Sequence, residues 1–394
     1  MYDVIVSGAG PSGTLAAWEC AKAGLCTLLL ERYRIPREKC CAGGLLQRAI
    51  DCLPYPLPEE VIEREIFGFT VQVGEERKEF SFSRRAGVVV RRQRLDGFLA
   101  RSAEKAGAEV LENSRALKIV EGRDHVLVKT IRGDFEGRFL IVAEGATSRA
   151  GRMLFGPYPR EHLAMGMAVD LELSNDPGGN IEIHLLDTPT RRLGPRSIFP
   201  LNGWVFPRAY GANLGVVGKG VQRSRMEDSI MIIRRRLEAR CGPCVGEGDL
   251  SAHPLPFVPR RRLHTGRSLA VGDAAGLVNP ITGEGMSYAF LSGRIAAQVV
   301  REQIRSSNHR PDLSPYASWI ADAIVQDLKA AGVLSPVLHR LMGVVDTKRF
   351  FEVVHDDQIL IEACLAIARG EENWRLLIRT IIPRFPRLFF SSLS

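Results

Sequence analysis

A glycine-rich turn near the N-terminus constrains the fold of this chain more than any other feature of its sequence. Residues 3–7 (DVIVS) have the apolar composition of a short strand, and the turn GAGPSG at residues 8–13 follows directly. A helical run extends from Thr14 to Ala23, and a second apolar strand at residues 27–30 ends at Glu31. This order of strand, G-x-G-x-x-G turn, helix, strand and acidic residue predicts a βαβ unit that binds a dinucleotide.

The glycines and the acidic residue of this unit each have a physical role in such a site. Gly8 permits the tight turn, Gly10 lets backbone N–H groups approach a diphosphate, and Gly13 lets the helix pack closely on the strand. The helix N-terminus adds partial positive charge. Glu31 can accept hydrogen bonds from ribose hydroxyls. We therefore expect a bound dinucleotide, and the alternative is a glycine turn that holds no ligand.

A second glycine-rich turn, far along the chain, favours FAD over NAD. A strand at residues 268–271 (SLAV) runs into the sequence GDAAG, and NPITGEGM at residues 279–286 precedes a long helix rich in small residues. Asp273 can bind a ribityl or ribose hydroxyl, and the turn from Gly283 to Gly285 can present N–H groups to a flavin ring edge. The alternative is a second strand-turn-helix unit that only packs.

Composition excludes several classes of protein. The 394 residues include 45% hydrophobic and 25% charged residues, which are globular values, and no uncharged apolar stretch reaches the roughly 18 residues of a membrane-spanning helix. The chain opens without the basic segment of a secretory leader and its eight cysteines are scattered, so we expect a reduced, cytoplasmic protein. The net charge of +8 suits anionic lipids, phosphorylated substrates or plain solvation. No nucleic-acid signature or metal-ligand spacing accompanies it.

Two segments in the first half of the chain add a family resemblance. The sequence RQRLD at residues 92–96 precedes an amphipathic helix, and FLIVA at residues 139–143 runs into EGATSR. Together with both glycine turns, these segments resemble the FAD-dependent glutathione-reductase-type and hydroxylase-type superfamily. The resemblance implies that the first turn binds the ADP part of FAD and that the Gly-Asp turn binds its ribityl chain. Glu144 stands where that superfamily usually has Asp.

Within this superfamily the chain is most similar to the geranylgeranyl reductase family, over roughly residues 1 to 310. The sequence KCCAGGL at residues 39–45 is similar to the family's K-x-C-(A/G)-x-G segment, which lies beside the flavin. The sequence PLNGWVFP at residues 200–207, with Gly215 and Gly218 after it, is close to the family's P-x-x-Y-x-W-x-F-P motif. Asn202 stands at the Tyr position of that motif.

The aromatic segment also has a physical interpretation of its own. Trp204 and Phe206 alternate along a predicted strand, so their side chains point to the same face. A broad aromatic face beside a flavin suits a long apolar substrate, whereas the alternative is an ordinary core strand. The flanking Pro200 and Pro207 favour an edge strand or a strand that lines a pocket.

These observations predict an α/β fold with an α+β insert. We expect a Rossmann-like FAD-binding domain of the glutathione-reductase/hydroxylase type, an inserted antiparallel-sheet substrate domain and a C-terminal helical region. The tail from Ile378 to Phe390 mixes Arg with large apolar residues, and either packing or contact with a membrane surface explains it. The expected boundaries are residues 1–65, 91–155 and 265–308 for the FAD-binding domain, 66–90 and 156–264 for the substrate domain, and 309–394 for the helices.

Cysteines require separate weighing. Cys241 and Cys244 form a C-x-x-C pair, but a thioredoxin-like thiol lies at a helix N-terminus, and this pair follows a predicted helix at residues 226–239. An inert turn is favoured, and a disulfide and redox activity stay open. The resemblance places Cys41 beside the flavin, where a thiol can shape the ring environment, supply a proton or simply fit.

The resemblance implies an FAD-dependent reductase that saturates C=C bonds of geranylgeranyl chains. Archaeal ether phospholipids are the preferred substrate, and a diphosphate, a chlorophyll or a quinone are the others. Reduced flavin would give a hydride to one alkene carbon while a proton reaches the other. NAD(P)H, ferredoxin or reduced deazaflavin would supply electrons, and the protein would contact the inner face of the membrane peripherally. The alternatives are a monooxygenase or halogenase of the same fold and a non-catalytic flavin or lipid carrier.

The resemblance carries over to named positions of this chain. The expected catalytic residues are Cys41, Trp204 and Phe206, of which the two aromatic residues would line the prenyl channel. No metal ligands are expected. The expected FAD contacts are Gly8, Gly10, Ser12, Gly13, Glu31, Cys41, Ala42, Gly44, Arg92, Ala116, Asp273, Gly285 and Met286.

Overall fold

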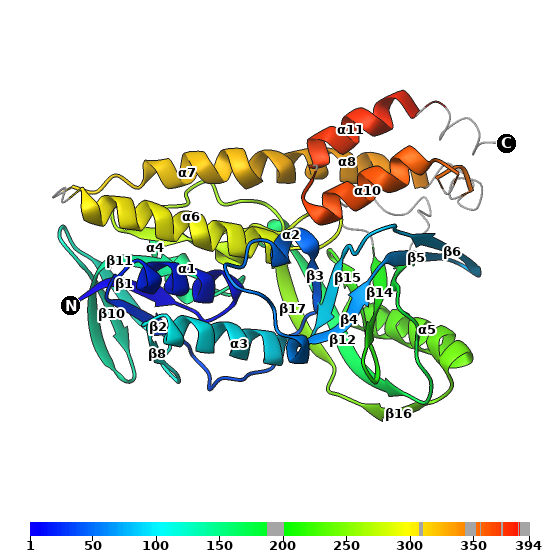
Figure 1. Cartoon of the computed structure of the whole chain (residues 1–394), viewed down its shortest axis with the longest axis horizontal. Helices are drawn as coiled ribbons and strands as arrows, with labels where there is room; N and C mark the ends of the chain where they lie inside the picture. Colours follow the sequence, from blue (N-terminus) through cyan, green and yellow to red (C-terminus); the bar gives the residue numbers. More distant parts are fainter. Residues whose placement is uncertain are drawn as a thin grey trace.

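A computed structural model places two sheets at opposite ends of an elongated molecule, with long helices running beside both (Figure 1). The structure describes residues 1–186, 201–306, 310–342, 352–354, 356–371, 373–384 and 386. The N-terminus lies at the end of the first sheet (Figure 1).

The first sheet confirms the predicted dinucleotide-binding fold. Its strand order is β8-β2-β1-β11-β10-β9, with β18 beside β11. β1 pairs in parallel with β2 and β11, and β11 pairs in parallel with β18, so the first glycine turn and the late one leave the same edge of the sheet. The strands are β1 (Tyr2–Ser7), β2 (Thr27–Leu30), β8 (Glu109–Leu111), β9 (Lys118–Glu121), β10 (Val126–Thr130), β11 (Gly133–Val142) and β18 (Ser268–Ala270).

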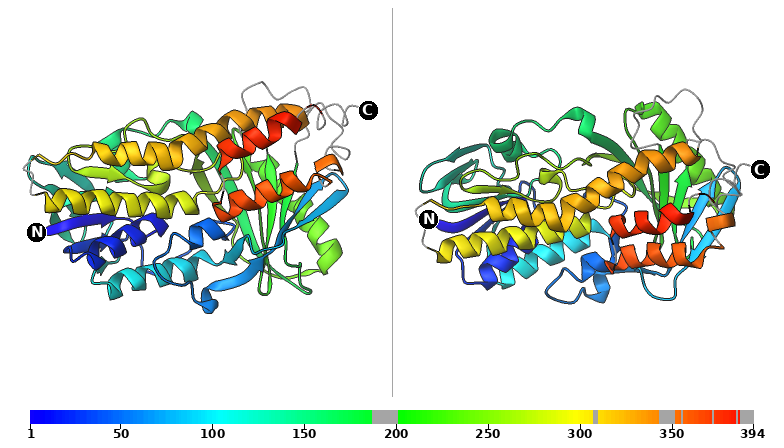
Figure 2. Two further views of the ribbon diagram at one scale, coloured as in Figure 1. Left: turned by 45° about the horizontal axis from the view of Figure 1, so that its top comes forward. Right: turned by 90° about the horizontal axis from the view of Figure 1, so that it is seen from above.

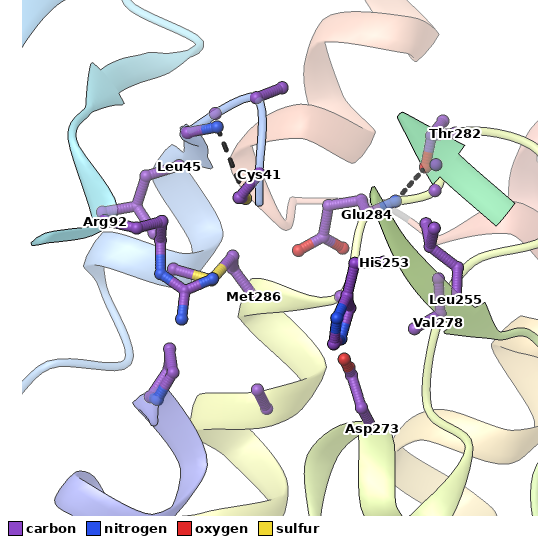
Figure 3. Close-up of a pocket in the computed structure, with 18 of the residues that line it drawn as sticks. Cys41, Leu45, Arg92, His253, Leu255, Asp273, Val278, Thr282, Glu284 and Met286 are labelled. Carbon is purple, nitrogen blue, oxygen red and sulfur yellow. Dashed lines mark hydrogen bonds between the residues drawn. The ribbon is translucent and has the colours of Figure 1, made fainter. Parts of the chain in front are cut away.

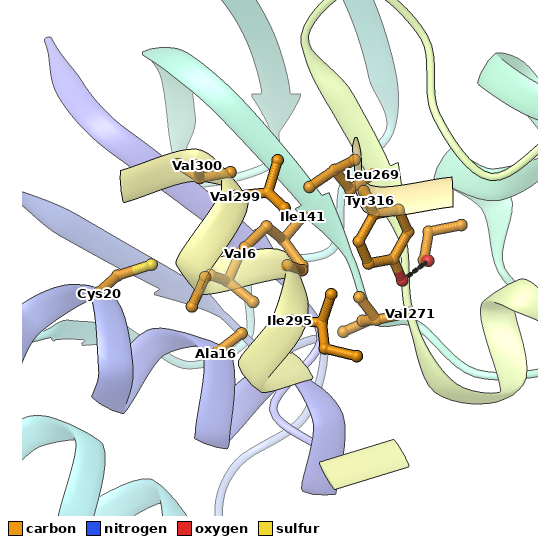
Figure 4. Packing of buried hydrophobic residues seen from close by; sticks show 14 of the residues in the cluster. Val6, Ala16, Cys20, Ile141, Leu269, Val271, Ile295, Val299, Val300 and Tyr316 are labelled. Atoms are coloured by element: carbon orange, nitrogen blue, oxygen red, sulfur yellow. Dashed lines mark hydrogen bonds between the residues drawn. The ribbon is translucent and has the colours of Figure 1, made fainter. Parts of the chain in front are cut away.

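Helices cover this sheet because its central strands are apolar on both faces. Val4, Ile5 and Val6 of β1 are fully buried, as expected of parallel strands between helices. Figure 4 shows Val6 and Ile141 packed against side chains of two of these helices, α1 and α6. The helices are α1 (Pro11–Lys22), α3 (Arg92–Lys105), α4 (Arg149–Phe155) and α6 (Met286–Arg305), with 3-10 turns η2 (Arg160–His162) and η3 (Gly272–Ala275).

Small residues in α6 let it approach the first glycine turn. A Cβ atom on Gly293 would lie 2.3 Å from the backbone oxygen of Ser12. α7 (Ser314–Ile320) contacts α6, and the hydroxyl of its Tyr316 donates to the Ala270 oxygen of β18 at 2.6 Å. The small-residue helix that follows the late turn is therefore the element that brings this turn beside the first one.

The second sheet carries the predicted aromatic strand in its middle. Its strand order is β16-β12-β15-β14-β13-β5-β6, with β17 beside β12. The helix α5 (Arg223–Cys241) buries Ile233 and Leu237 against one face. The strands are β5 (Gly68–Val73), β6 (Glu76–Ser81), β12 (Leu163–Leu173), β13 (Ile181–Leu185), β14 (Asn202–Arg208), β15 (Gly211–Gly218), β16 (Cys244–Glu247) and β17 (Ser251–Pro256).

Two details of this sheet correct the sequence-based expectations. The segments from the two halves of the insert do join in one sheet, but β5 and β13 pair in parallel, so the sheet is mixed rather than wholly antiparallel. β14 is an inner strand between β13 and β15, so of the two expected placements the edge strand is wrong and the strand that lines a pocket is the one found. Its Pro207 is tolerated because the pairing of β13 with β14 extends only to Val205. Pro200 lies outside the described residues.

A small third sheet connects the two parts. β7 (Gly87–Val90) pairs with β3 (Gly44–Leu46) and β4 (Ile62–Ile66), and α3 follows β7. The short helices α2 (Gln47–Ile50) and η1 (Glu59–Val61) belong to the same region. The segment that carries Cys41 therefore leads directly into β3.

The C-terminal helices pack across the second sheet as well as on each other (Figure 2). α10 buries Ile361 against Val71 and Phe80 of the second sheet. Ile378 and Ile381 of α11 are partly buried against the apolar cluster of the C-terminal helices, so packing accounts for the described start of the mixed tail. None of the described helices is long and apolar enough to cross a membrane. The elements are α7 (Ser314–Ile320), the π-helical turn η4 (Ala321–Val325), α8 (Gln326–Met342), α10 (Gln358–Arg369), α11 (Trp374–Ile381) and η5 (Ile382–Arg384).

Candidate functional site

One cavity of about 790 Å³ joins the two sheets and the C-terminal helices. This volume is in the range of cofactor and ligand sites. Every predicted FAD contact and catalytic residue lines the cavity except Gly13. The fold thus brings residues as far apart in sequence as Gly8, Ala116 and Met286 to the lining of one cavity.

The first glycine turn has the geometry of a diphosphate cradle. Gly8 has φ 109°, and a Cβ atom there would lie 2.5 Å from the oxygen of Ala143. A Cβ atom on Gly13 would lie 1.9 Å from the oxygen of Gly8, so this glycine serves helix packing rather than ligand contact. No side chain caps α1, which begins at Pro11. Its first N–H groups are therefore available to an anion.

Glu31 is held in place at the end of β2. Its side chain is 4% exposed. Its carboxylate accepts the N–H of Ala9 at 3.0 Å and the N–H of Tyr33 at 3.1 Å. Nε of Arg37 lies 3.4 Å away. The carboxylate lines the cavity beside the glycine turn, as a ribose contact requires.

Arg92 is buried and already paired. Its Nε and Nη2 donate to the two carboxylate oxygens of Asp96 at 2.8 and 2.9 Å. Burial alone would lower the pKa of Arg92, but Asp96 keeps it above the ordinary value. Arg37 also contacts Asp96, at 3.2 Å. The carboxylates of Asp96 and Glu31 therefore balance the charges of the two guanidinium groups. Arg92 lines the cavity as a cation whose position is fixed by Asp96.

The late turn meets the first one at Ser12. A Cβ atom on Gly272 would lie 2.8 Å from the Ser12 hydroxyl oxygen. The next residue, Asp273, is partly buried, and this burial raises the pKa of its carboxyl although Lys39 and Arg92 oppose the rise. Figure 3 shows Asp273 and His253 facing each other across the cavity. Asp273 is well placed to accept a hydrogen bond from a hydroxyl-rich ligand.

The Cys41 segment links the cradle to the aromatic strand. Sγ of Cys41 accepts the N–H of Gly43 at 3.4 Å. Gly43 has φ 85°, and a Cβ atom there would lie 2.1 Å from the oxygen of Val90. A Cβ atom on Gly44 would lie 2.5 Å from the ring of Phe206. The glycines therefore let this segment lie flat between β7 and the aromatic ring.

Trp204 and Phe206 line the same cavity from β14, as the alternation predicted. Nε1 of Trp204 donates to Asn213 on β15 at 2.9 Å, which fixes the indole ring. A Cβ atom on Gly215 would lie 2.3 Å from this indole, so the trailing glycine of the motif makes room for it. The face of β14 that carries the aromatic rings is opposite the face that α5 covers.

Sequence reasoning missed the far end of the cavity. Cys364, Ile367 and Ala368 of α10, with Trp374 and Leu377 of α11, line it. The helical periodicity of these segments indicated packing, but no local pattern indicates which part of the fold they cover. They form the part of the cavity wall that the C-terminal helices contribute.

Sequence reasoning also missed a buried network that connects the late turn to the C-terminal helices. Nη2 of Arg48 lies 2.6 Å from Oε2 of Glu284 and donates to the Tyr288 hydroxyl at 3.2 Å. Tyr288 donates to Asp327 at 2.9 Å, and Asp327 accepts the N–H of Trp374 at 2.7 Å. Glu284 and Trp374 both line the cavity. The network therefore fixes the turn beside Gly285 relative to the cavity's far wall.

The C-x-x-C pair is remote from this site. Cys241 is the last residue of α5, where the helix dipole disfavours a thiolate. Burial raises the pKa of its thiol. Cys241 and Cys244 are free thiols, and neither lines the cavity.

The residues present fit FAD. The uncapped N-terminus of α1, with Gly10 at its start, suits a diphosphate. Glu31 suits the adenosine ribose, and Asp273, which lines the cavity, suits a ribityl hydroxyl. Among the described residues no cluster of His, Cys, Asp or Glu is suited to a metal ion.

Comparisons with known proteins agree with this geometry. Residues 1–291 match the family model described as FAD binding domain. The chain is 30% identical to digeranylgeranylglycerophospholipid reductase 2 of Methanopyrus kandleri, over 93% of this chain and 96% of that protein. It is also 30% identical to the menaquinone reductase of Mycobacterium tuberculosis, over 76% of each chain.

Solved structures share the fold. A geranylgeranyl bacteriochlorophyll reductase-like protein from Thermoplasma acidophilum superposes with a TM-score of 0.78, at 23% identity, over 97% of this chain and 98% of that chain. A flavin-dependent brominase gives a TM-score of 0.68 at 19% identity, over 98% of this chain and 99% of that chain. Likeness at these identities concerns the fold alone.

Proposed function

Because the chain belongs to the FAD-binding-domain family, and within it to the geranylgeranyl reductases, we propose that it saturates C=C bonds of geranylgeranyl chains. The continuity of the cavity carries this proposal. The FAD cradle opens past the Cys41 segment into a space with apolar walls, formed by β13, β14 and the C-terminal helices. A long, flexible hydrocarbon is the ligand that such walls favour.

The proposed mechanism assigns orientation and water exclusion to this chain's residues. Bound FAD, once reduced, supplies the hydride. Trp204 and Phe206 present apolar faces to the prenyl chain and hold an alkene against the flavin side of the cavity. The thiol of Cys41, which accepts the N–H of Gly43 and lines the cavity, is the proposed proton source. The FAD contacts named from the sequence belong to the same proposal.

An archaeal-type ether phospholipid is the proposed substrate. The 30% identity to a reductase named for such a lipid supports it, as does the net charge of +8. The relative named menaquinone reductase makes the prenyl tail of a quinone the main competitor. NAD(P)H, ferredoxin or reduced deazaflavin is the proposed electron donor. We also propose a cytoplasmic protein that contacts the inner face of the membrane peripherally.

Mass spectrometry of lipid products tests this function. Pure protein is loaded with FAD, reduced without oxygen and incubated separately with a digeranylgeranyl phospholipid and a menaquinone. A reductase adds two hydrogen atoms per double bond. A monooxygenase or halogenase instead requires oxygen and adds an oxygen or halogen atom, and a carrier leaves every mass unchanged. Either of the last two results would contradict the proposal.

Filling the far end of the cavity is expected to shorten the substrate that is accepted. In Ala368→Trp the indole occupies space between α10 and the apolar walls. We expect kcat/KM for a geranylgeranyl substrate to fall by roughly 10-fold or more, while a geranyl analogue is reduced at the original rate. Glu362→Trp, on the exposed side of the same helix, is the control and should change neither value. Equal losses for the long and the short chain would show that this end does not hold the tail.

A further inference from the structure

Lys39 differs from Arg37, Arg48 and Arg92, the cations beside it in the cavity wall, because its ammonium has no partner among the described residues. Lys39 belongs to the loop that connects β2 to β3, and it lines the cavity. Arg92 is paired with Asp96, Arg37 with Glu31 and Asp96, and Arg48 with Glu284. The Lys39 ammonium forms no hydrogen bond or ion pair with any residue that the structure describes.

The surroundings of Lys39 disfavour its charge. The pKa of Lys39 is lowered to about 8, mainly by burial and also by the charge of Arg92 on α3. Asp273 on η3 and the neighbouring thiols Cys40 and Cys41 oppose this shift. A partly buried ammonium without a counter-ion is costly. An anion that enters the cavity would remove this cost.

The neighbouring strand β17, whose Ser251 oxygen accepts a hydrogen bond from Cys40, lies in the field of the same cations. His253 on β17 lines the cavity, and its Nε2 atom is buried without a hydrogen-bond partner. Burial lowers the pKa of His253 to about 3, and Lys39 and Arg92 are the next causes. The ring is therefore neutral at physiological pH and does not act as a second cation. Lys39 is thus left as an unpaired cation in this part of the cavity.

The position of Lys39 identifies the anion. The Lys39 ammonium interacts electrostatically with Asp273 in the late turn, with Arg92 and with Cys41. The Gly272–Ser12 contact places the Asp273 turn against the start of α1. The anion that FAD brings to the N-terminus of α1 is its diphosphate. Lys39 therefore lies among groups that surround the expected diphosphate and ribityl chain, rather than in the apolar part of the cavity.

We propose that Lys39 is the counter-charge of the FAD diphosphate, and that its protonation makes cofactor binding dependent on pH. The proposal rests on the FAD site and is independent of the prenyl substrate. The sign follows from linkage. The diphosphate favours the protonated form of Lys39, so the pKa of Lys39 is higher in the FAD complex than in the free protein. At a pH above the pKa of Lys39 in the free protein, binding of FAD therefore requires the uptake of a proton. FAD affinity is therefore constant below about pH 7.5 and falls by up to tenfold per pH unit above about pH 8.

Titration of the apoprotein with FAD tests this inference by flavin fluorescence, from about pH 6.5 to 9.5. Lys39→Met should weaken FAD binding by about 10- to 100-fold at neutral pH and abolish the dependence above pH 8. Lys39→Arg keeps its charge throughout, so it should bind FAD without the alkaline loss. Lys22→Met removes the same charge from the exposed end of α1 and should behave like the wild type.

ADP-ribose distinguishes the diphosphate from the ring as the group that Lys39 contacts. It contains the diphosphate but no flavin, and its affinity is measured by competition with FAD. We expect Lys39→Met to weaken ADP-ribose and FAD by the same factor. Loss of FAD affinity alone would assign Lys39 to the ring, and a pH profile unchanged in Lys39→Met would overturn the proposal. Thermal melts of each apoprotein separate these outcomes from loss of fold.

Discussion

Gly13→Ala is expected to yield a destabilised protein that does not retain FAD. The added Cβ atom would lie 1.9 Å from the oxygen of Gly8 and 2.9 Å from the Cβ atom of Ala143. Both neighbours belong to the first sheet or its turn, so α1 must move away from β1 to relieve the overlap. We expect the affinity for FAD to fall by about 100-fold or more, because the N-terminus of α1 leaves the diphosphate. Flavin content and a thermal melt measure the two effects.

Gly10→Ala separates cofactor contact from fold. A Cβ atom there has only Nη2 of Arg37 near it, at 3.9 Å, so the apoprotein should keep its stability. It would nevertheless project toward the bound diphosphate, and FAD affinity should fall steeply. Gly332→Ala on α8 has comparable space and lies outside the site, so it should not affect FAD. Normal FAD binding in Gly10→Ala would show that the diphosphate does not lie against this turn.

Arg48→Met is expected to destabilise the protein by about 3–5 kcal/mol, because it leaves Glu284 buried without its partner. The side chains are 13% and 9% exposed, so water screens the pair poorly. Burial alone would lower the pKa of Arg48, but Glu284 and Tyr288 keep it above the ordinary value. The same substitution breaks the chain of hydrogen bonds to α8 and α11. Chemical denaturation measures the loss.

A second substitution tests the cause. Arg48→Met combined with Glu284→Gln removes the unpaired charge and should recover much of the lost stability. Arg84→Met breaks the exposed pair with Glu371, whose side chains are 53% and 41% exposed, and should cost less than about 1 kcal/mol. Similar losses for Arg48→Met and Arg84→Met, or no recovery in the double variant, would show that the buried network does not hold these helices.

Local patterns were sufficient to predict the first sheet, and the residues expected to contact FAD, apart from Gly13, line one cavity. A side chain on Gly13 would overlap Gly8, five residues away, and a side chain on Gly8 would overlap Ala143 at the end of the neighbouring strand. Both restrictions therefore depend only on neighbours within the βαβ unit or on the adjacent strand. The alternation of Trp204 and Phe206 correctly placed both rings on one face. These features are readable because strand and helix periods fix the direction of a side chain.

Features that depend on distant pairing could not be predicted. The parallel contact of β5 with β13, and the inner position of β14, follow from partners far apart in the chain. Arg48 meets Tyr288 across 240 positions. The lack of a partner for Lys39 is equally invisible in a sequence, because it depends on every element that surrounds the ammonium. The role of Cys41 as a proton source and the domain boundaries stay predictions.

Anaerobic reoxidation of the flavin by substrate tests the central claim most directly. FAD-loaded protein is bleached by photoreduction, mixed with a digeranylgeranyl phospholipid in the absence of any other acceptor, and followed by flavin absorbance. If one tightly held flavin faces an apolar prenyl cavity, the yellow colour returns, with one double bond lost per flavin reoxidised. A flavin that stays bleached with every prenyl lipid, yet recovers at once in oxygen, would contradict that claim.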